Sequence, residues 1–355
     1  MADSPDYSPL LKSTPKYASK TRIGNVRNVS RFTWLEWGYV LLVSFSILGV
    51  LSLSIKSLVA FSTTNNDTTC ASFSANCSTN IHESCDSWTC RVDFIFAVLL
   101  LVNLAFCTYY TVDGLFRERG FETLAYVLGV VAVLLYVIIN YKMNPGTGSD
   151  HLFKLIRLIL VCIFAPPNIL LAIVVWWRMG RINFLMVGSV RSLLWAYQIR
   201  SCFVTLVVFN VELMASVTTL AFARKSTFLS NAEMVVLPVV LCMTILLAIF
   251  TILTVSYEWW KAMVLYYFFS LIPTSYYIYK IVNVVINLQD YHCTVDQCSS
   301  PRVTYQTVAV VQLFACGLGT LAYFGIIPVA VLTHRNFGKG LKERVPPPFS
   351  VNGHH

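Results

Sequence analysis

Residues 122–141 read ETLAYVLGVVAVLLYVIINY, an almost unbroken run of apolar side chains. A helix of about 20 such residues crosses a hydrocarbon core about 30 Å thick. Seven further stretches of comparable character lie at 37–61, 92–112, 155–177, 201–222, 234–256, 262–287 and 306–332. The sequence therefore predicts an all-α fold, a polytopic transmembrane bundle of about eight helices.

The overall composition supports a membrane protein. Of the 355 residues, 56% are hydrophobic and 12% are charged, whereas soluble domains are about 45–50% apolar and about 25% charged. So little charge cannot cover the surface of a soluble protein of this length. Soluble enzymes and nucleic-acid-binding modules are excluded, and the net charge of +9 is better explained by Lys and Arg that orient membrane helices.

The distribution of basic residues predicts the orientation and the domains. The N-terminal tail, residues 1–35, carries six Lys or Arg and two Asp, so we expect it to be cytoplasmic and disordered. An eight-span domain at 36–333 and a basic cytoplasmic tail at 334–355 follow. Arg224 and Lys225 are exceptions, because the predicted orientation places them on the side of the membrane opposite the cytoplasm. The basic segment 178–200 is either an interfacial helix or an extension of a neighbouring span.

Two exterior loops are expected, at 62–91 and 288–305. The first holds two glycosylation acceptors, Asn66 and Asn76, in Asn-x-Thr/Ser triplets. Cysteines are typical of disulfides in such oxidising loops, and six lie here: Cys70, Cys77, Cys85, Cys90, Cys293 and Cys298. The close pairs 85/90 and 293/298 each enclose four residues, although the four cysteines of the first loop allow three pairings. A redox or metal site is the alternative, but no CxxC spacing supports it.

Ionisable residues inside a membrane are functional candidates by default. Glu212 lies near the middle of the fifth span beside Asn210, and Lys280 lies in the seventh span. Each is expected to face the bundle interior. A buried ion pair between Glu212 and Lys280, or a hydrogen-bonded Glu212, would hold the helices together, whereas a titrating Glu212 would indicate a proton-coupled or substrate-contacting site. Lys280 could instead extend to the membrane surface.

The fourth span contains Pro166-Pro167-Asn168 near its centre. Two adjacent prolines remove two backbone donors and clash with preceding carbonyls, so a kink or break is expected. Many transporters bind substrate or ions at broken helices. Pro166, Pro167 and Asn168 therefore join Glu212, Lys280 and Asn210 as candidates for a central polar path.

Both tails carry patterns that predict partners. Asp6, Tyr7, Leu10 and Leu11 resemble an acidic dileucine signal overlapping a tyrosine-based signal, which would recruit sorting adaptors and direct the protein to endosomes or lysosomes. An ordinary Ser/Pro-rich tail is the alternative. After the last span, Phe337, Leu341 and Val345 recur every four residues among basic residues. As a helix, this segment would lie on acidic lipids of the cytoplasmic leaflet.

The run Asn336-Phe337-Gly338-Lys339-Gly340-Leu341-Lys342-Glu343, together with Tyr197-Gln198, resembles an uncharacterised family of animal multi-pass membrane proteins. The resemblance covers the last half of the chain. It implies no activity and no site residue.

These observations lead to two hypotheses for function. The first is a transporter or channel-like protein for a small solute in an endosomal, lysosomal or plasma membrane, with the lipid bilayer as its main partner. The second is a non-transporting receptor, adaptor or scaffold. Enzyme motifs such as Gly-x-Ser-x-Gly and His-Glu-x-x-His are absent from the sequence, so we expect no enzymatic activity, no metal, no cofactor and no nucleic-acid partner. Oligomeric state is left open. A cavity lined by both Glu212 and Lys280 and reaching the fourth span would favour transport.

Overall fold

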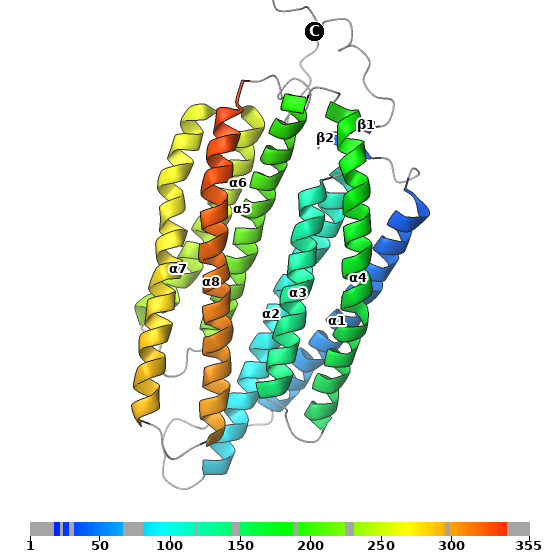
Figure 1. Cartoon of the computed structure of the whole chain (residues 1–355). Coiled ribbons are helices and arrows are strands. Elements are labelled where there is room, and N and C mark those ends of the chain that lie inside the picture. The colour runs from blue at the N-terminus through cyan, green and yellow to red at the C-terminus, as the bar shows by residue number, and fades with distance from the viewer. Residues whose placement is uncertain are drawn as a thin grey trace, which may run out of the picture.

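The computed structural model is a bundle of eight long α-helices (Figure 1). It describes residues 18–21, 24–27, 32–66, 81–117, 119–143, 149–187, 191–223, 231–294 and 299–338. The helices are Trp34–Asn66 (α1), Ile81–Arg117 (α2), Gly120–Met143 (α3), Ser149–Val187 (α4), Arg191–Ala223 (α5), Asn231–Tyr257 (α6), Trp260–Thr294 (α7) and Ser299–Arg335 (α8).

All eight helices contain a segment long and apolar enough to cross a membrane, so the predicted all-α transmembrane bundle is confirmed. The α3 segment, Gly120–Lys142, contains the stretch that decided the prediction. Outside the bundle, two short antiparallel strands, Ala18–Thr21 (β1) and Gly24–Arg27 (β2), pair with Ser19 opposite Val26. The sequence did not predict these strands.

The helices extend further than the apolar stretches. α1 runs to Asn66 and α2 begins at Ile81, while α7 runs to Thr294 and α8 begins at Ser299. The predicted loops 62–91 and 288–305 are therefore largely helical, because a helix can continue past the membrane boundary with polar residues. Segment 178–200 is not a separate interfacial helix: α4 continues to Val187 and α5 starts at Arg191.

The eight helices form two halves with the same neighbour order. In the first half α1 packs on α2, α2 on α3, α3 on α4, and α4 returns to α1; α5–α8 form an equivalent ring. The main contact between the halves is α2 against α5, as the separation of the two groups in Figure 1 suggests. Residues buried between the halves are therefore candidates for any function that depends on movement of one half against the other.

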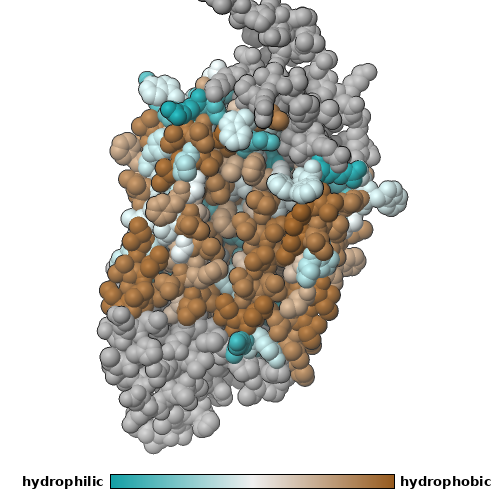
Figure 2. Space-filling model, viewed as in Figure 1, coloured by the Kyte–Doolittle hydropathy of each residue, from teal (hydrophilic) through white to brown (hydrophobic). Residues whose placement is uncertain are grey.

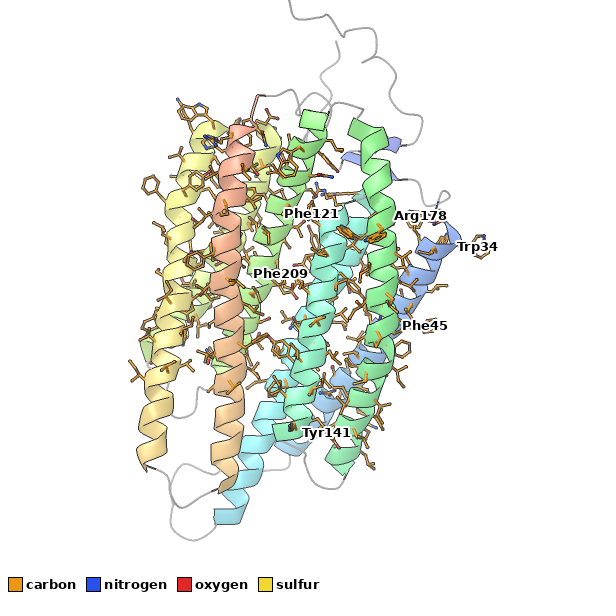
Figure 3. All side chains as sticks on the ribbon, viewed as in Figure 1. Trp34, Phe45, Phe121, Tyr141, Arg178 and Phe209 are labelled. Carbon is orange, nitrogen blue, oxygen red and sulfur yellow. The ribbon has the colours of Figure 1, made fainter. Side chains whose placement is uncertain are left out.

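The outer surface matches a lipid environment. Figure 2 shows a broad hydrophobic band over the helices, and side chains such as Phe45 on α1 and Phe324 on α8 are exposed. Trp34 and Phe45 project away from the bundle (Figure 3). Exposed tryptophans gather at the end of the bundle where α1 and α3 start and α2 and α4 end: Trp34, Trp177, Trp195, Trp259 and Trp260. Tryptophan is enriched at membrane–water interfaces, so this end marks one boundary of the membrane.

Candidate functional site

Glu212 lies between the two halves. Its side chain on α5 is 2% exposed, and its Oε2 accepts a hydrogen bond of 3.0 Å from the hydroxyl of Tyr110 on α2. The other carboxylate oxygen, Oε1, faces α3: a Cβ built on Gly129 would lie 3.6 Å from it. The predicted interior position of Glu212 is confirmed, and its neighbours come from the opposite half.

Lys280 is buried separately, within the second half. Its side chain is 1% exposed, its Nζ lies 6.0 Å from the ring centroid of Tyr276, and it interacts electrostatically with Cys316 on α8. Among the described residues, Glu212 and Lys280 do not form an ion pair, so the predicted pairing is wrong. The burial of Lys280 also contradicts an extension to the membrane surface.

Asn210 holds three helices of the second half together. Its Nδ2 donates to the hydroxyl of Tyr323 on α8 at 2.9 Å, and its Oδ1 accepts from the hydroxyl of Tyr277 on α7 at 3.3 Å. Gly319 lets the Tyr277 ring approach α8, because a Cβ there would lie 2.6 Å from the ring. This network explains the burial of Asn210 by the hydrogen bonds that join α5 to α7 and α8.

The prolines do not break the fourth helix. α4 runs without interruption through Pro166 and Pro167, so a break is wrong, while the alternative of a kink stays a prediction. Pro166 faces outward, while the next turn is held inside by Asn168, whose Nδ2 donates to Ser46 Oγ on α1 at 2.7 Å. Packing of α4 against α1 and α3 outweighs the loss of two backbone hydrogen bonds.

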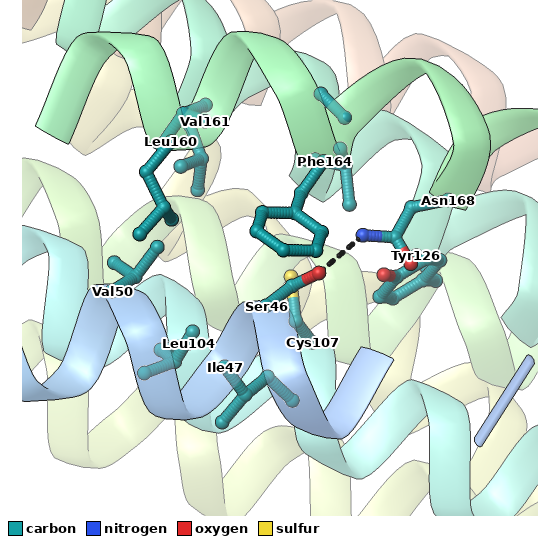
Figure 4. Close-up of a pocket in the computed structure, with 13 residues that line it drawn as sticks. Ser46, Ile47, Val50, Leu104, Cys107, Tyr126, Leu160, Val161, Phe164 and Asn168 are labelled. Atoms are coloured by element: carbon teal, nitrogen blue, oxygen red, sulfur yellow. Dashed lines mark hydrogen bonds between the residues drawn. The ribbon is translucent and has the colours of Figure 1, made fainter. Parts of the chain in front are cut away.

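A cavity of about 60 Å³ lies inside the first half (Figure 4). All four helices of that half contribute to its wall: Ser46, Ile47, Val50, Leu104, Cys107, Tyr126, Val130, Val133, Leu160, Val161, Phe164, Ala165 and Asn168. Of the predicted candidates, only Asn168 is among these residues. Glu212 and Lys280 do not line this cavity, so it does not join them to the fourth helix.

Cys107 lines the cavity and packs near Glu212 at Gly129. A Cβ on Gly129 would lie 3.1 Å from Cys107 Sγ and 3.6 Å from Glu212 Oε1. Cys107, Tyr110 and Gly129 were not predicted as site residues. Their types are ordinary for a membrane helix, so only the spatial arrangement reveals them.

Charged residues cluster at the tryptophan-rich end of the bundle. Arg119 Nη1 lies 3.1 Å from Glu122 and 3.5 Å from Asp113, and Arg117 Nε lies 3.0 Å from Asp113. Burial by itself lowers the pKa of Arg119, but the carboxylates of Glu122 and Asp113 outweigh burial and raise its pKa above the ordinary value. The cluster therefore retains a charged Arg119 at the turn between α2 and α3.

In the second half of the bundle, α8 is followed by a turn at residues 336–338. Gly338 in this turn has a positive φ of 79°. Its backbone N–H donates to Glu258 at 3.1 Å. Phe337 is partly buried and packs against the hydrophobic core. Leu341 and Val345 lie outside the described residues, so the helix on acidic lipids stays a prediction.

Other predicted residues lie outside the described structure. These are the sorting residues Asp6, Tyr7, Leu10 and Leu11, the acceptor Asn76, and Cys70, Cys77 and Cys298. Asn66, Cys85, Cys90 and Cys293 lie in helices whose backbone is described there, but their side chains are not. The five cysteines within the spans are free thiols: Cys107, Cys162, Cys202, Cys242 and Cys316. Over the described residues, no group of His, Cys, Asp and Glu could hold a metal ion.

Comparison with known proteins finds one family model that matches part of the chain. A model described as a domain of unknown function (DUF7789) matches residues 78–177, which cover α2, α3 and most of α4. The match lies in the first half of the chain, whereas the sequence resemblance rested on the second half. No curated protein and no solved structure matches the chain significantly.

Proposed function

We propose that this multi-pass integral membrane protein transports a small solute, without enzymatic activity, and that Glu212 is the group that takes up and releases a proton during transport. The observation that carries the proposal is the position of Glu212 between two like four-helix halves, where Tyr110 of the first half donates to its carboxylate. Transporters built from two like halves bind substrate and coupling ions near the bilayer midplane, where the halves meet.

Movement of the halves would act directly on this carboxylate. Rocking one half against the other breaks the Tyr110–Glu212 hydrogen bond and opens the buried surface around Glu212. An ionised carboxylate is costly in the hydrocarbon core without a compensating partner, so proton exchange and movement of the halves are coupled. Lys280 is not part of the proposed mechanism, because it is buried within the second half and not between the two halves.

The test is solute uptake by protein reconstituted into vesicles with an imposed pH gradient. Candidate solutes come from metabolite profiling of organelles with and without the protein. Glu212→Gln should abolish the pH dependence of uptake. The matched control is Glu36→Gln, because Glu36 is equally buried but caps α1 through the backbone N–H of Thr33. Unchanged pH-dependent uptake in Glu212→Gln removes Glu212 from the mechanism.

A non-transporting receptor, adaptor or scaffold is the second candidate. The closed Asn210–Tyr277–Tyr323 network favours it, because a scaffold needs a rigid interior and no path. Organelles that have the same solute content with and without the protein would support this alternative.

We also propose an endosomal or lysosomal location, with the plasma membrane as the alternative. The support is the Asp6–Leu11 pattern in the N-terminal tail. Replacing Leu10 and Leu11 with Ala should move the protein to the cell surface, and an unchanged distribution would contradict the proposed signal.

A further inference from the structure

We propose that Arg200 binds an anionic oxygen group, a carboxylate or a phosphate, at the tryptophan-rich end of the contact between the two halves. The inference rests on the proposed function in one respect, namely that this group belongs to the transported solute. It adds the substrate class, an acidic small molecule, and the residue that recognises its charge.

Arg200 lies inside the membrane-spanning part of α5. This part runs from Leu194 to Ala221. Arg200 follows Trp195, one of the exposed tryptophans that mark the membrane boundary, by five positions, a rise of about 8 Å along the helix. An ionisable side chain within a span is costly, and it is a functional candidate by default.

The guanidinium of Arg200 has no hydrogen bond or ion pair with any of the residues that the structure describes. The side chain is partly buried. Of its three nitrogens only Nη1 is fully enclosed, so a ligand can still reach the group from the end of the bundle. Arginines at such positions are usually paired, and the planar guanidinium matches a carboxylate or a phosphate with two parallel hydrogen bonds.

The charges around Arg200 favour an additional anion. Its first charged neighbour is Arg119 at the turn between α2 and α3, and the second is Glu258 at the turn between α6 and α7. Arg119 is already paired with Asp113 and Glu122. An anion bound to Arg200 would offset the repulsion from Arg119 and supply the acceptor that the guanidinium lacks.

The position of Arg200 couples this site to movement of the halves. Arg119 belongs to the first half and Arg200 to the second, so rocking the halves changes the distance between the two cations. Arg200 is also on the same helix as Glu212, 12 positions earlier, which is about 18 Å along the axis. A monovalent anion that moves together with the proton of Glu212 carries no net charge across the membrane.

The experiment measures the binding of inorganic phosphate and of succinate to the full-length protein by isothermal titration calorimetry. The protein is held in phosphatidylcholine nanodiscs at low ionic strength. The wild type should bind at least one of the two anions saturably. Arg200→Gln should weaken that binding at least tenfold. Arg200→Lys keeps the charge but loses the planar fork, so it should weaken binding at least threefold.

A second measurement separates binding from a structural role. Without anion, the unfolding midpoint of Arg200→Gln should equal or exceed that of the wild type, because Arg200 donates no hydrogen bond to the protein and is repelled by Arg119. A lower midpoint would assign Arg200 to structure and count against the proposal. The matched control is Arg178→Gln. Arg178 is also partly buried at this end of the bundle (Figure 3), but its Nη1 donates to Thr33 Oγ1 at 3.3 Å. This variant should bind the anions as the wild type does.

A lipid headgroup presents the same phosphate chemistry as a soluble anion. Nanodiscs that contain phosphatidic acid distinguish the two sources, with native mass spectrometry to count the lipid molecules that the protein retains. Retention of phosphatidic acid that depends on Arg200, with no binding of phosphate or succinate, would confirm the anion site and contradict its assignment to a solute. Equal binding of all three probes by wild type and Arg200→Gln, or no binding by the wild type, would overturn the proposal. If Arg200→Gln does not fold, Arg200→Lys decides, and wild-type affinity in that variant would overturn it.

The readout does not depend on transport. Anion binding that requires Arg200, with no uptake that depends on Glu212, would support the anion site and contradict the proposed function. Anion binding that does not require Arg200, with uptake that still depends on Glu212, would do the reverse.

Discussion

Tyr110 and Glu212 lie 102 residues apart in the chain and are joined by a buried hydrogen bond of 3.0 Å between the two halves of the bundle. The donor is on α2 and the acceptor is on α5, the two helices that make the main contact between the halves. The bond therefore reports on the state of this interface.

Tyr110→Phe removes the donor and keeps the ring. We expect the free energy of unfolding to fall by about 1–3 kcal/mol, because the carboxylate loses a buried partner. Thermal or SDS unfolding in detergent measures the change. The control is Tyr109→Phe. The Tyr109 side chain is more exposed, so removing its hydroxyl should lower the free energy of unfolding only slightly.

A double-mutant cycle with Glu212→Gln checks this assignment. Residues that share one hydrogen bond show interaction energies of about 0.5–3 kcal/mol. Additive effects of the two substitutions would contradict an energetically significant bond across the interface.

Gly319→Ala tests the packing of α8 on α7. A Cβ at this position would lie 2.6 Å from the ring of Tyr277, and the ring cannot move freely because its hydroxyl bonds to Asn210. We expect a loss of about 1–3 kcal/mol in unfolding free energy. Gly317→Ala is the control, since nothing lies within 4 Å there, and it should be neutral or stabilising by up to about 1 kcal/mol.

A second double-mutant cycle tests whether the ring of Tyr277 causes the loss in Gly319→Ala. Tyr277→Leu should reduce the cost of Gly319→Ala, because the ring is the group that clashes. An equal cost in both backgrounds would show that the close approach is not the cause.

Arg119→Gln should destabilise the protein more than Arg117→Gln. Arg119 bridges Asp113 and the nearly fully buried Glu122, so its removal leaves a buried carboxylate without its cation, at a cost of about 3 kcal/mol. Arg117 forms a more exposed pair with Asp113, for which about 0–1 kcal/mol is expected. Similar unfolding midpoints for the two variants would contradict the distinction.

The eight spans could be predicted because bilayer thickness imposes one requirement on every spanning helix, about 20 apolar residues. The arrangement of the spans could not. Hydropathy carries no information on which helices pack together. A pairing of Glu212 with Lys280 was therefore one of several open alternatives, and only the fold shows that one lies between the halves and the other inside the second half.

Predictions from backbone chemistry and residue type alone were incomplete where packing between helices determines the structure. Pro166 and Pro167 predict a kinked or broken helix from backbone chemistry alone, but α4 is unbroken and packs on both α1 and α3. Cys107 and Gly129 gave no signal, because a small residue in a membrane helix is ordinary until its neighbours are known.

The predicted topology requires glycans on the side of the membrane opposite the N-terminal tail. The acceptors are Asn66, the last residue of α1, and Asn76. Glycosidase should increase the electrophoretic mobility of the wild-type protein expressed in cells and should not affect a variant with Gln at both positions. Equal mobility of treated and untreated wild type would contradict the orientation or the use of these acceptors.

The helical backbone of α2 restricts the disulfides of the first exterior segment. Cys85 and Cys90 both lie in α2, five positions apart, where helix geometry separates their Cα atoms by about 8–9 Å. Disulfides require Cα atoms within about 7 Å, so a direct Cys85–Cys90 bond does not fit this helix. We therefore expect Cys85 and Cys90 to bond to Cys70 and Cys77, in one of the two remaining pairings. Mass spectrometry of peptides cleaved between Cys85 and Cys90 without reduction should find each of them linked to a peptide from residues 67–80. Recovery of a linked 85–90 pair would show that α2 begins after Cys90.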